Sequence, residues 1–329
     1  MPFFMGDQNQ LGFKYESGTY TNASGGEQWI GQIQDHTLTE EENISSIRYL
    51  GIGTRNVDNF LLGNRDVKGK FSYYPQDWKM LGYALGSCVD GGSPSPYTHT
   101  IAEVESDDGW YGVSGTMNTF PSMTLVDSKS ALGTGNNFIR TIKGAMIDKI
   151  SISASQGEVV KVDVDYMGQS VDFSSGAKGS ISIPTNDAFI YSDIRLSIPS
   201  GTTICEVKEA TFSINNNMEA KHYLCGSREA KTIMPGKREY ELSATLDMTS
   251  ENGKTIYESY FKGGSLFNSI FEVTRTAGSR DAFFFLSGCR VTEMDLPSPT
   301  DGINEYKVKI VPKTCSVLVD DLTFKYNAW

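Results

Sequence analysis

Hydrophobic and polar residues alternate along much of this chain. In the run 160–166, three valines and a tyrosine occupy the even positions and charged residues occupy the odd ones. This period of two is typical of a β-strand with one buried face. Similar runs lie at 181–183, 190–198, 207–214, 240–246, 270–276, 282–286 and 306–310, and turn residues at 107–109, 200–201, 252–253 and 277–279 separate such runs. The pattern predicts a mainly β protein.

Helical periodicity is scarce. In the segment 76–86, Trp78, Leu81 and Leu85 recur at three- and four-residue spacing, Pro75 stands just before it and Gly86 closes it. These features predict one short α-helix. A second short helix is expected at 254–262, where apolar residues gather on one side and Gly263 follows.

One sequence pattern occurs twice. Residues 53–67 and 226–240 share two glycines and two arginines at identical spacing, namely Gly53, Arg55, Gly63 and Arg65 against Gly226, Arg228, Gly236 and Arg238. A second pair, 142–152 and 286–296, follows in the same order. We interpret the repeat as a duplicated domain, with an irregular N-terminal arm at 1–36, a first β domain at 37–180 and a second at 181–329.

The repeated unit holds the candidate contact residues. Its glycines bracket an apolar tip, and an exposed apolar tip costs solubility unless it docks on a surface. Two interpretations remain open: the loop folds back on its own domain, or it contacts another subunit, with arginines pairing to carboxylates there. The candidate subunit-contact residues are Arg55, Phe60, Leu61, Leu62, Arg65, Arg228, Ile233, Met234 and Arg238.

Charge limits the partners of the chain. Lys and Arg number 29 against 40 Asp and Glu, so the formal net charge is -11. Residues 1–180 carry 13 against 21, a net of -8, and the remainder carries 16 against 19, a net of -3. An acidic protein lacks the basic face that nucleic-acid phosphates require.

Motifs for catalysis or cofactor binding are not found. The three histidines, His36, His99 and His222, lie at no metal-ligand spacing, and neither a nucleophile elbow nor a phosphate-binding loop occurs. Asp163 and Asp165 share one strand face, but the second copy has Lys307 and Lys309 there, which favours a solvated face over a metal site. We expect no enzyme, no cofactor and no metal.

Targeting signals are also not visible. The five cysteines are unpatterned, which favours reduced, mostly buried thiols. No signal peptide is recognisable, and no stretch approaches the roughly 18 apolar residues that span a bilayer. We therefore expect a soluble protein that is made in the cytoplasm and has no membrane partner.

Several segments, in order, resemble the tail tube proteins of tailed bacteriophages and archaeal tailed viruses. They are the opening 11–20 with Trp29-Ile30-Gly31, the passage 150–162, and the hairpin 226–246 with its Arg-Glu and Pro-Gly-Lys-Arg-Glu core. The resemblance implies two tandem β-barrel or β-sandwich domains, each with one short helix, in a structural virion protein of the tail.

The resemblance also implies the partners. The chain would assemble with itself into stacked rings, as trimers with pseudo-six-fold symmetry or else as hexamers. It would contact other tail proteins (tape measure, terminator, baseplate or tip) and carry DNA only as cargo. If six domains each lend four strands, the channel would measure roughly 35–40 Å across. The alternatives are a tail-tip module that binds a receptor or carbohydrate, and the inner tube of a contractile injection system.

Overall fold

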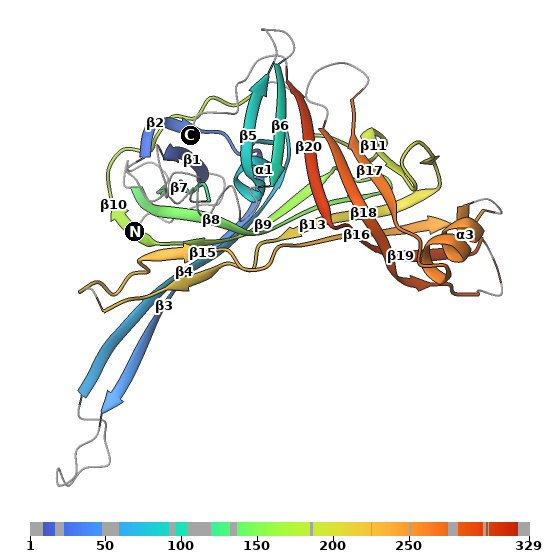
Figure 1. Ribbon diagram of the computed structural model, residues 1–329. Helices are drawn as coiled ribbons and strands as arrows, with labels where there is room; N and C mark the ends of the chain where they lie inside the picture. The colour runs from blue at the N-terminus through green and yellow to red at the C-terminus, as the bar shows by residue number, and fades with distance from the viewer. Residues whose placement is uncertain are drawn as a thin grey trace.

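The computed structural model describes residues 9–16, 23–47, 59–91, 97–103, 120–131, 137–184, 187–224, 226–249, 252–275, 282–298, 301 and 303–321. Strands dominate this part of the chain (Figure 1), which confirms the mainly β prediction. The helical segments are short: α1 (Lys79–Leu85), the 3-10 turn η2 (Tyr191–Asp193), α3 (Asn252–Thr255) and the π-helical η3 (Ile256–Lys262).

A long antiparallel sheet runs through both halves of the chain. Its strands, in spatial order, are β3 (Gln32–Ile47), β4 (Asn59–Tyr74), β9 (Lys161–Gly168), β8 (Asn137–Ser155), β13 (Val207–Asn215), β16 (Glu239–Asp247), β19 (Glu305–Val311) and β18 (Ala282–Asp295). Along β13 and β16 buried positions alternate with half-buried or exposed ones. One face of the sheet is therefore apolar and the other polar, as the period of two predicts.

Two smaller sheets complete the arrangement. The first joins β1 (Gln10–Glu16), β2 (Ala23–Gln28), β7 (Met123–Ser130) and β10 (Ser170–Ser174) to the start of β8. The second joins β5 (Gly86–Gly91), β6 (Tyr97–Glu103), β11 (Ile194–Ser197), β12 (Thr203–Ile204), β17 (Phe267–Val273) and β20 (Thr314–Asp321) to the start of β18. A separate ribbon pairs β14 (Glu219–Lys221) with β15 (Thr232–Met234).

Two glycines let β8 and β18 pass from a small sheet into the long one. Gly144 and Gly288 have φ values of 60° and 61°. Residues with a Cβ rarely adopt this left-handed conformation, and in a strand it turns the chain. The glycines occupy equivalent positions in the two halves, so each half places a bent strand between two sheets.

The core lies between the long sheet and the smaller sheets. The Phe284 ring of β18 lies 5.5 Å from both Phe212 of β13 and Phe271 of β17. The helix α1 is buried throughout and ends at Gly86, which has the left-handed φ of 100°. The two predicted helices are thus confirmed, although the first begins at Lys79 rather than near residue 76.

The two halves of the chain repeat one scheme of strand pairing. The pairs β1–β2, β1–β7, β3–β4, β4–β9, β7–β8, β8–β9 and β8–β10 correspond to β11–β12, β11–β17, β13–β16, β16–β19, β17–β18, β18–β19 and β18–β20. Irregularities also coincide, since the ladders β8–β9 and β18–β19 shift register next to Asp148 and Thr292. The ribbon β14–β15 corresponds to the distal part of β3–β4, since Ala220↔Ile233 matches Ser46↔Phe60, whereas the hairpin β5–β6 has no counterpart among the described residues.

Several sequence expectations need correction. Residues 10–16 and 23–28 are paired strands rather than an irregular arm, and 32–36 begin β3. Residues 181–184 form no strand, 191–193 are helical rather than extended, and Asn252-Gly253 opens α3 instead of a turn. No closed barrel forms from the strands that the structure describes, since no strand pairs with the outer edge of β3 or with the outer edge of β18 beyond its bend.

Candidate functional site

The polar face of the long sheet is continuous across both halves. Residues that pair directly across neighbouring strands share one face. One such row crosses six strands through Asp35, Ser72, Asp163, Ser151, Ser213 and Glu241. The expectation that Asp163 and Asp165 lie on a solvated strand face is confirmed, because both are exposed.

Charges on this face are compensated between strands. Asp165 lies between Lys70 and Lys149 in the ladders of the first half. In the second half the signs reverse, and Lys309 pairs with Glu293 and binds Glu241 at 2.8 Å. Aspartates on β9 are replaced by lysines on β19. Lysines on the strands beside β9 are in turn replaced by glutamates on the strands beside β19.

The second half nevertheless presents the more acidic polar face. Its ladders place Glu209, Glu239, Glu241, Asp247, Glu293, Asp295 and Glu305 there with Arg290, Lys307 and Lys309. The first half is nearly balanced, with Asp35, Glu41, Asp66, Asp163 and Asp165 against Lys68, Lys70, Lys149 and Lys161. The net charge of the whole first half is more negative than that of the second half, but the charge of its polar face is not. The net charge of each half therefore does not describe the charge of this face.

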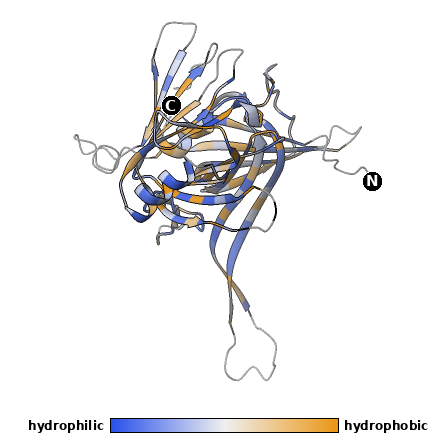
Figure 2. Ribbon diagram, turned by 90° about the vertical axis from the view of Figure 1, so that its right-hand side faces the viewer, coloured by the Kyte–Doolittle hydropathy of each residue, from blue (hydrophilic) through white to orange (hydrophobic). Residues whose placement is uncertain are grey.

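The strands β3 and β4 continue beyond the sheet as a two-stranded arm (Figure 1). The distal end of the arm carries hydrophobic positions (Figure 2), and Ile44, Phe60, Leu61 and Leu62 are 50% to 63% exposed. A two-stranded ribbon is marginally stable in water, and clustered apolar side chains favour docking. The structure thus places Phe60, Leu61 and Leu62 on an exposed projection, while Arg55 lies outside the described residues.

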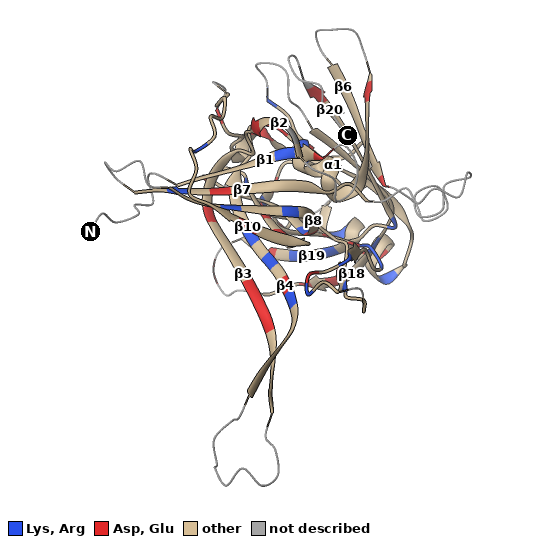
Figure 3. Cartoon of the chain, turned by 90° about the vertical axis from the view of Figure 1, so that its left-hand side faces the viewer, with Lys and Arg blue, Asp and Glu red and all other residues tan. Residues whose placement is uncertain are grey.

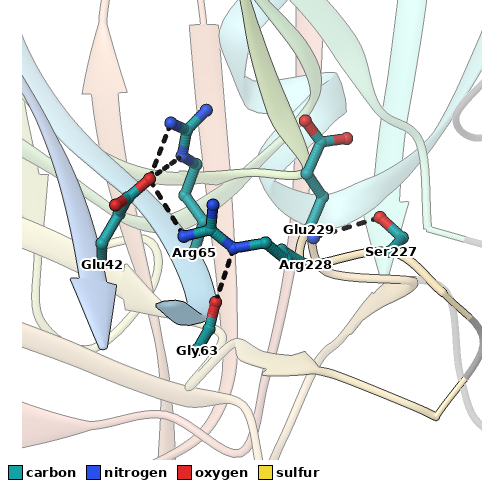
Figure 4. Close-up of polar contacts among 6 residues, drawn as sticks. All are labelled: Glu42, Gly63, Arg65, Ser227, Arg228 and Glu229. Atoms are coloured by element: carbon teal, nitrogen blue, oxygen red, sulfur yellow. Dashed lines mark hydrogen bonds and ion pairs between the residues drawn. The ribbon is translucent and has the colours of Figure 1, made fainter. Parts of the chain in front are cut away.

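A charged cluster holds the root of the arm (Figures 3 and 4). Arg65 donates to Glu42 Oε1 at 2.8 and 3.2 Å, and Arg228 approaches the same oxygen at 3.1 Å. The Arg65 backbone N–H donates to the Arg228 carbonyl at 2.8 Å. The hydrogen bond from Arg65, with help from Arg228, holds the pKa of Glu42 below its usual value.

The same segment of the second half makes two further contacts with the arm root. Arg228 Nε donates to the Gly63 carbonyl at 2.9 Å, and His222 lies 2.8 Å from Asp66. Two of the predicted contact arginines, Arg65 and Arg228, therefore meet on a carboxylate of their own chain. Their described partners lie within the chain, and a contact of these arginines with another subunit stays a prediction.

The second copy of the repeated unit is folded into the chain. Ile233 is 2% exposed and packs with Phe120, Met146 and Met218, so the expected exposed tip is not found here. Met234 is half-buried. For this copy the observed geometry matches the alternative in which the loop folds back.

Arg238 joins the two halves at the end of α1. It donates to Asn216 Oδ1 at 2.8 Å and to the Leu85 carbonyl at 3.2 Å. Asn216 in turn donates to the carbonyls of Ala84 and Ile147, both at 3.0 Å. These side chains satisfy carbonyl groups that a helix end leaves without partners.

The arm root and this helix cap are built alike. Arg65 bonds Glu42 as Arg238 bonds Asn216. A Cβ on Gly63 would lie 2.6 Å from the Asn43 carbonyl oxygen, and one on Gly236 would lie 2.7 Å from that of Asn217. Only glycine fits such close approaches, which explains why both copies keep it.

A comparison with models of known protein families identifies the family of this chain. The family model of the phage tail tube protein matches residues 6–310. The chain belongs to the phage tail tube protein family. No curated protein is similar enough to the chain to count as a match. Membership supports a structural component of the virion tail, and no helix in the described ranges has the length and hydropathy needed to cross a bilayer.

Titratable side chains that lie away from the polar face contact one another in the interior of the protein. His36 bonds the Tyr166 hydroxyl at 2.9 Å and lies 3.7 Å from Asp127. Within the described part, the cluster that could hold a metal is Cys88, Asp90 and His99. Asp90 and His99 already bond each other at 2.7 Å, and burial raises the pKa of the Cys88 thiol to about 12, so a proton occupies the sulfur at neutral pH.

Sequence reasoning missed Glu42 and Asn216. Glu42 accepts hydrogen bonds from Arg65, and Asn216 accepts one from Arg238. In each case the next residue is an asparagine, and its backbone carbonyl oxygen lies close to a glycine of the repeat. The available signal was the position of 41–43 and 215–217 relative to the repeat, which makes the two segments equivalent. A module that binds carbohydrate would need exposed aromatic side chains; the candidates are Trp78, which is only 1% exposed, and Tyr111, which lies outside the described residues.

Proposed function

We propose that this chain is a structural subunit that polymerises into stacked rings, and that the rings form the hollow tube of a viral tail. The observation that carries the proposal is the long sheet, which has a buried face, a polar face and two edges that pair with no strand of the described residues. Open edges are sites for pairing with another chain. A closed ring of such sheets would remove every edge and enclose the polar face.

The strand count supports three chains in a ring. Eight strands per chain and three chains give 24 strands, which at about 4.8 Å spacing and about 40° tilt have a circumference of roughly 150 Å. The backbone diameter is then roughly 48 Å, which leaves roughly 35–40 Å between side chains. The repeated pairing scheme makes the two halves equivalent units of a pseudo-six-fold ring. Six chains in a ring would double the strands and widen the channel.

The polar face suits a conduit for DNA. Lys70, Lys149, Lys307 and Lys309 lie opposite carboxylates in the same ladders, Lys161 binds Asp163 on its own strand, and the second half is acidic overall. Most lysines that the structure describes on this face thus have an acidic partner, so a duplex would pass without tight binding. DNA is in this proposal a cargo and not a ligand, and the function requires no catalytic group.

The arm supplies a contact between subunits or rings. Ile44, Phe60, Leu61 and Leu62 would be buried against a neighbouring chain, while the Glu42 cluster fixes the direction of the arm. Self-assembly is the first partnership; the tape measure, terminator and baseplate or tip proteins would meet the ends of the tube.

Negative-stain microscopy of the purified chain tests the proposal. Hollow tubes or rings with a stain-filled centre are expected at high protein concentration. A chain that stays monomeric at every concentration and salt condition would contradict it. Retention on a glycan array by that monomer would favour the receptor-binding alternative instead.

A further inference from the structure

The chain contains one completed junction between its halves and two edges at which the same junction is open. In the completed junction, β8 pairs antiparallel with β13 from Lys149↔Asn215 to Ser155↔Glu209. By the repeated pairing scheme, β18 is the counterpart of β8 and β3 is the counterpart of β13. In the described part of the chain, the corresponding edges of β18 and β3 pair with nothing.

The repeat fixes which residues correspond. Ile147↔Tyr166 and Val291↔Ile310 are the same pairing, shifted by 144 residues on both strands. Glu41↔Asp66 and Asn215↔Glu239 are likewise the same pairing, shifted by 174 and 173 residues. Lys149 therefore corresponds to Glu293, and Asn215 corresponds to Glu41.

We infer that β18 of one chain pairs antiparallel with β3 of a second copy, in the register that sets Glu293 opposite Glu41 and Asp295 opposite Thr39. This inference rests on the proposed function, because it specifies how the chains of one ring are joined. The completed junction serves as its template: Lys149↔Asn215 becomes Glu293↔Glu41, and Ser151↔Ser213 becomes Asp295↔Thr39.

Apolar side chains that are buried at the completed junction have more exposed counterparts at the open edges, which supports pairing with a second chain there. Ile150 and Ile152 of β8 are each 1% exposed, whereas their counterparts Met294 and Leu296 are half-buried and 38% exposed. A second strand beside β18 would cover both. Apolar area removed from water is the main favourable term in such an association.

The arm shows the same difference. Met218 and Ile233 are 6% and 2% exposed at the completed junction, and their counterparts Ile44 and Phe60 are 54% and 63% exposed. Pairing of β3 with a second copy would bring the arm to the side of β18 where the apolar cluster forms in the template. The exposed arm residues thus acquire a specific partner surface.

The open junction differs from its template in charge. Lys149 and Asn215 carry one positive charge between them, whereas Glu293 and Glu41 are both acidic. Asp66 lies opposite Glu41 on β4, Lys309 lies opposite Glu293 on β19, and Glu40, Lys68, Asp295 and Lys307 follow in the adjoining rows. Like charges directly opposite one another oppose pairing.

The open junction is also shorter. Pro297 follows two residues after the end of β18 and has no backbone N–H to donate. The chain-to-chain ladder therefore contains fewer hydrogen bonds than the ladder between β8 and β13. Together with the facing carboxylates, this makes the chain-to-chain junction the weaker of the two, so chains remain separable before assembly.

Cysteine cross-linking tests the register. In a background with Cys205→Ser and Cys225→Ser, Asp295→Cys combined with Thr39→Cys places two thiols on directly opposed residues. Paired strands hold such residues about 4.5–5.5 Å apart at Cα, within the range of a disulfide. Oxidation of assembled protein should give covalent multimers that end at a closed ring, and the diluted monomer should give none.

Asp295→Cys with Thr37→Cys is the matched control, since Thr37 shares the face of Thr39 but lies two residue pairs away in the ladder. Equal cross-linking of both combinations, or none in rings that microscopy shows to be intact, would overturn the register and leave the proposed function standing. Failure to form rings at all, in the parent chain as well, would overturn the proposed function and the inference together.

Discussion

The junction inside the chain and the open edges at its ends share one framework but differ in chemistry. At the internal junction Asn216 and Arg238 cap a helix, and Met218 and Ile233 lie in a buried apolar cluster. At the open edge Glu42, Arg65, Ile44 and Phe60 take the equivalent places, and the two apolar side chains are exposed. Glycine positions, arginine positions and strand register are the same. The contact inside the chain sets Lys149 opposite Asn215 and buries its apolar side chains, whereas the contact proposed between chains sets two carboxylates opposite one another and is shorter.

The largest expected effect comes from removing the apolar end of the arm. Phe60→Asp with Leu62→Asp should abolish rings and tubes, because two charges would be buried at the chain-to-chain contact. The isolated chain should keep its fold, since both side chains are exposed in it. Sedimentation velocity and far-UV circular dichroism would measure the two properties. Ile183→Asp, at a position 64% exposed outside the arm, is the control and should still assemble. Normal tubes from the double variant would remove the arm from the assembly contact.

The equivalent pair Ile233 and Phe60 separates folding from assembly. Ile233→Ala should lower the free energy of unfolding of the monomer by about 2–5 kcal/mol, because it leaves a cavity in a buried cluster. Phe60→Ala should change that free energy by less than about 0.5 kcal/mol, as is usual at exposed positions. Urea denaturation of both variants would test the contrast. Equal losses would mean that the arm is part of the folded core.

A smaller effect is expected from the facing carboxylates. Glu293→Gln with Glu41→Gln should let rings form at lower salt and lower protein concentration, because repulsion across the junction is removed. Added salt should help the parent chain, since the screening length falls from about 10 Å at 0.1 M to about 3 Å at 1 M. Light scattering across a salt series would compare them. Glu258→Gln, on η3, has an exposed side chain and should behave like the parent. A double variant with unchanged salt dependence would contradict the assigned register.

The smallest expected effect is a pH dependence at the root of the arm. The hydrogen bond from Arg65 lowers the pKa of Glu42 from 4.5, so the ionised form is favoured in the folded chain. The stabilising contribution is therefore complete above pH 4.5 and is lost as the pH falls through the lower value of the folded state. Proteolysis of the arm over a pH series should accelerate in that window, and Glu42→Gln should remove this component.

Much of the fold was predictable from local pattern. The alternation of apolar and polar residues at 207–214 and 240–246 corresponds to β13 and β16, because one face of each strand packs against the apolar core. The same alternation occurs at 11–15, where Leu11, Phe13 and Tyr15 are the apolar positions, and it indicates the strand β1 that the structure has there. At 181–183 alternation was misleading. Ile181 packs its side chain over Gly12 without a partner strand, so the residues pack without a ladder.

The candidate site was predictable only in part. The repeat located Arg65, Arg228 and Arg238, but one sequence does not reveal that Glu42 lies between Arg65 and Arg228, which come from different halves. Nor does it distinguish an exposed Phe60 from a buried Ile233, because both occupy the same place in the motif. The difference arises from neighbouring strands: β13 has β8 beside it, whereas none of the strands that the structure describes lies on that side of β3.

Native mass spectrometry of the smallest assembled particle tests the central claim, that rings form by repeating the internal junction between chains. We expect a closed particle of three chains, with no stable dimer because two chains would leave edges open. A closed ring of six chains, or a chain that never associates, would contradict it.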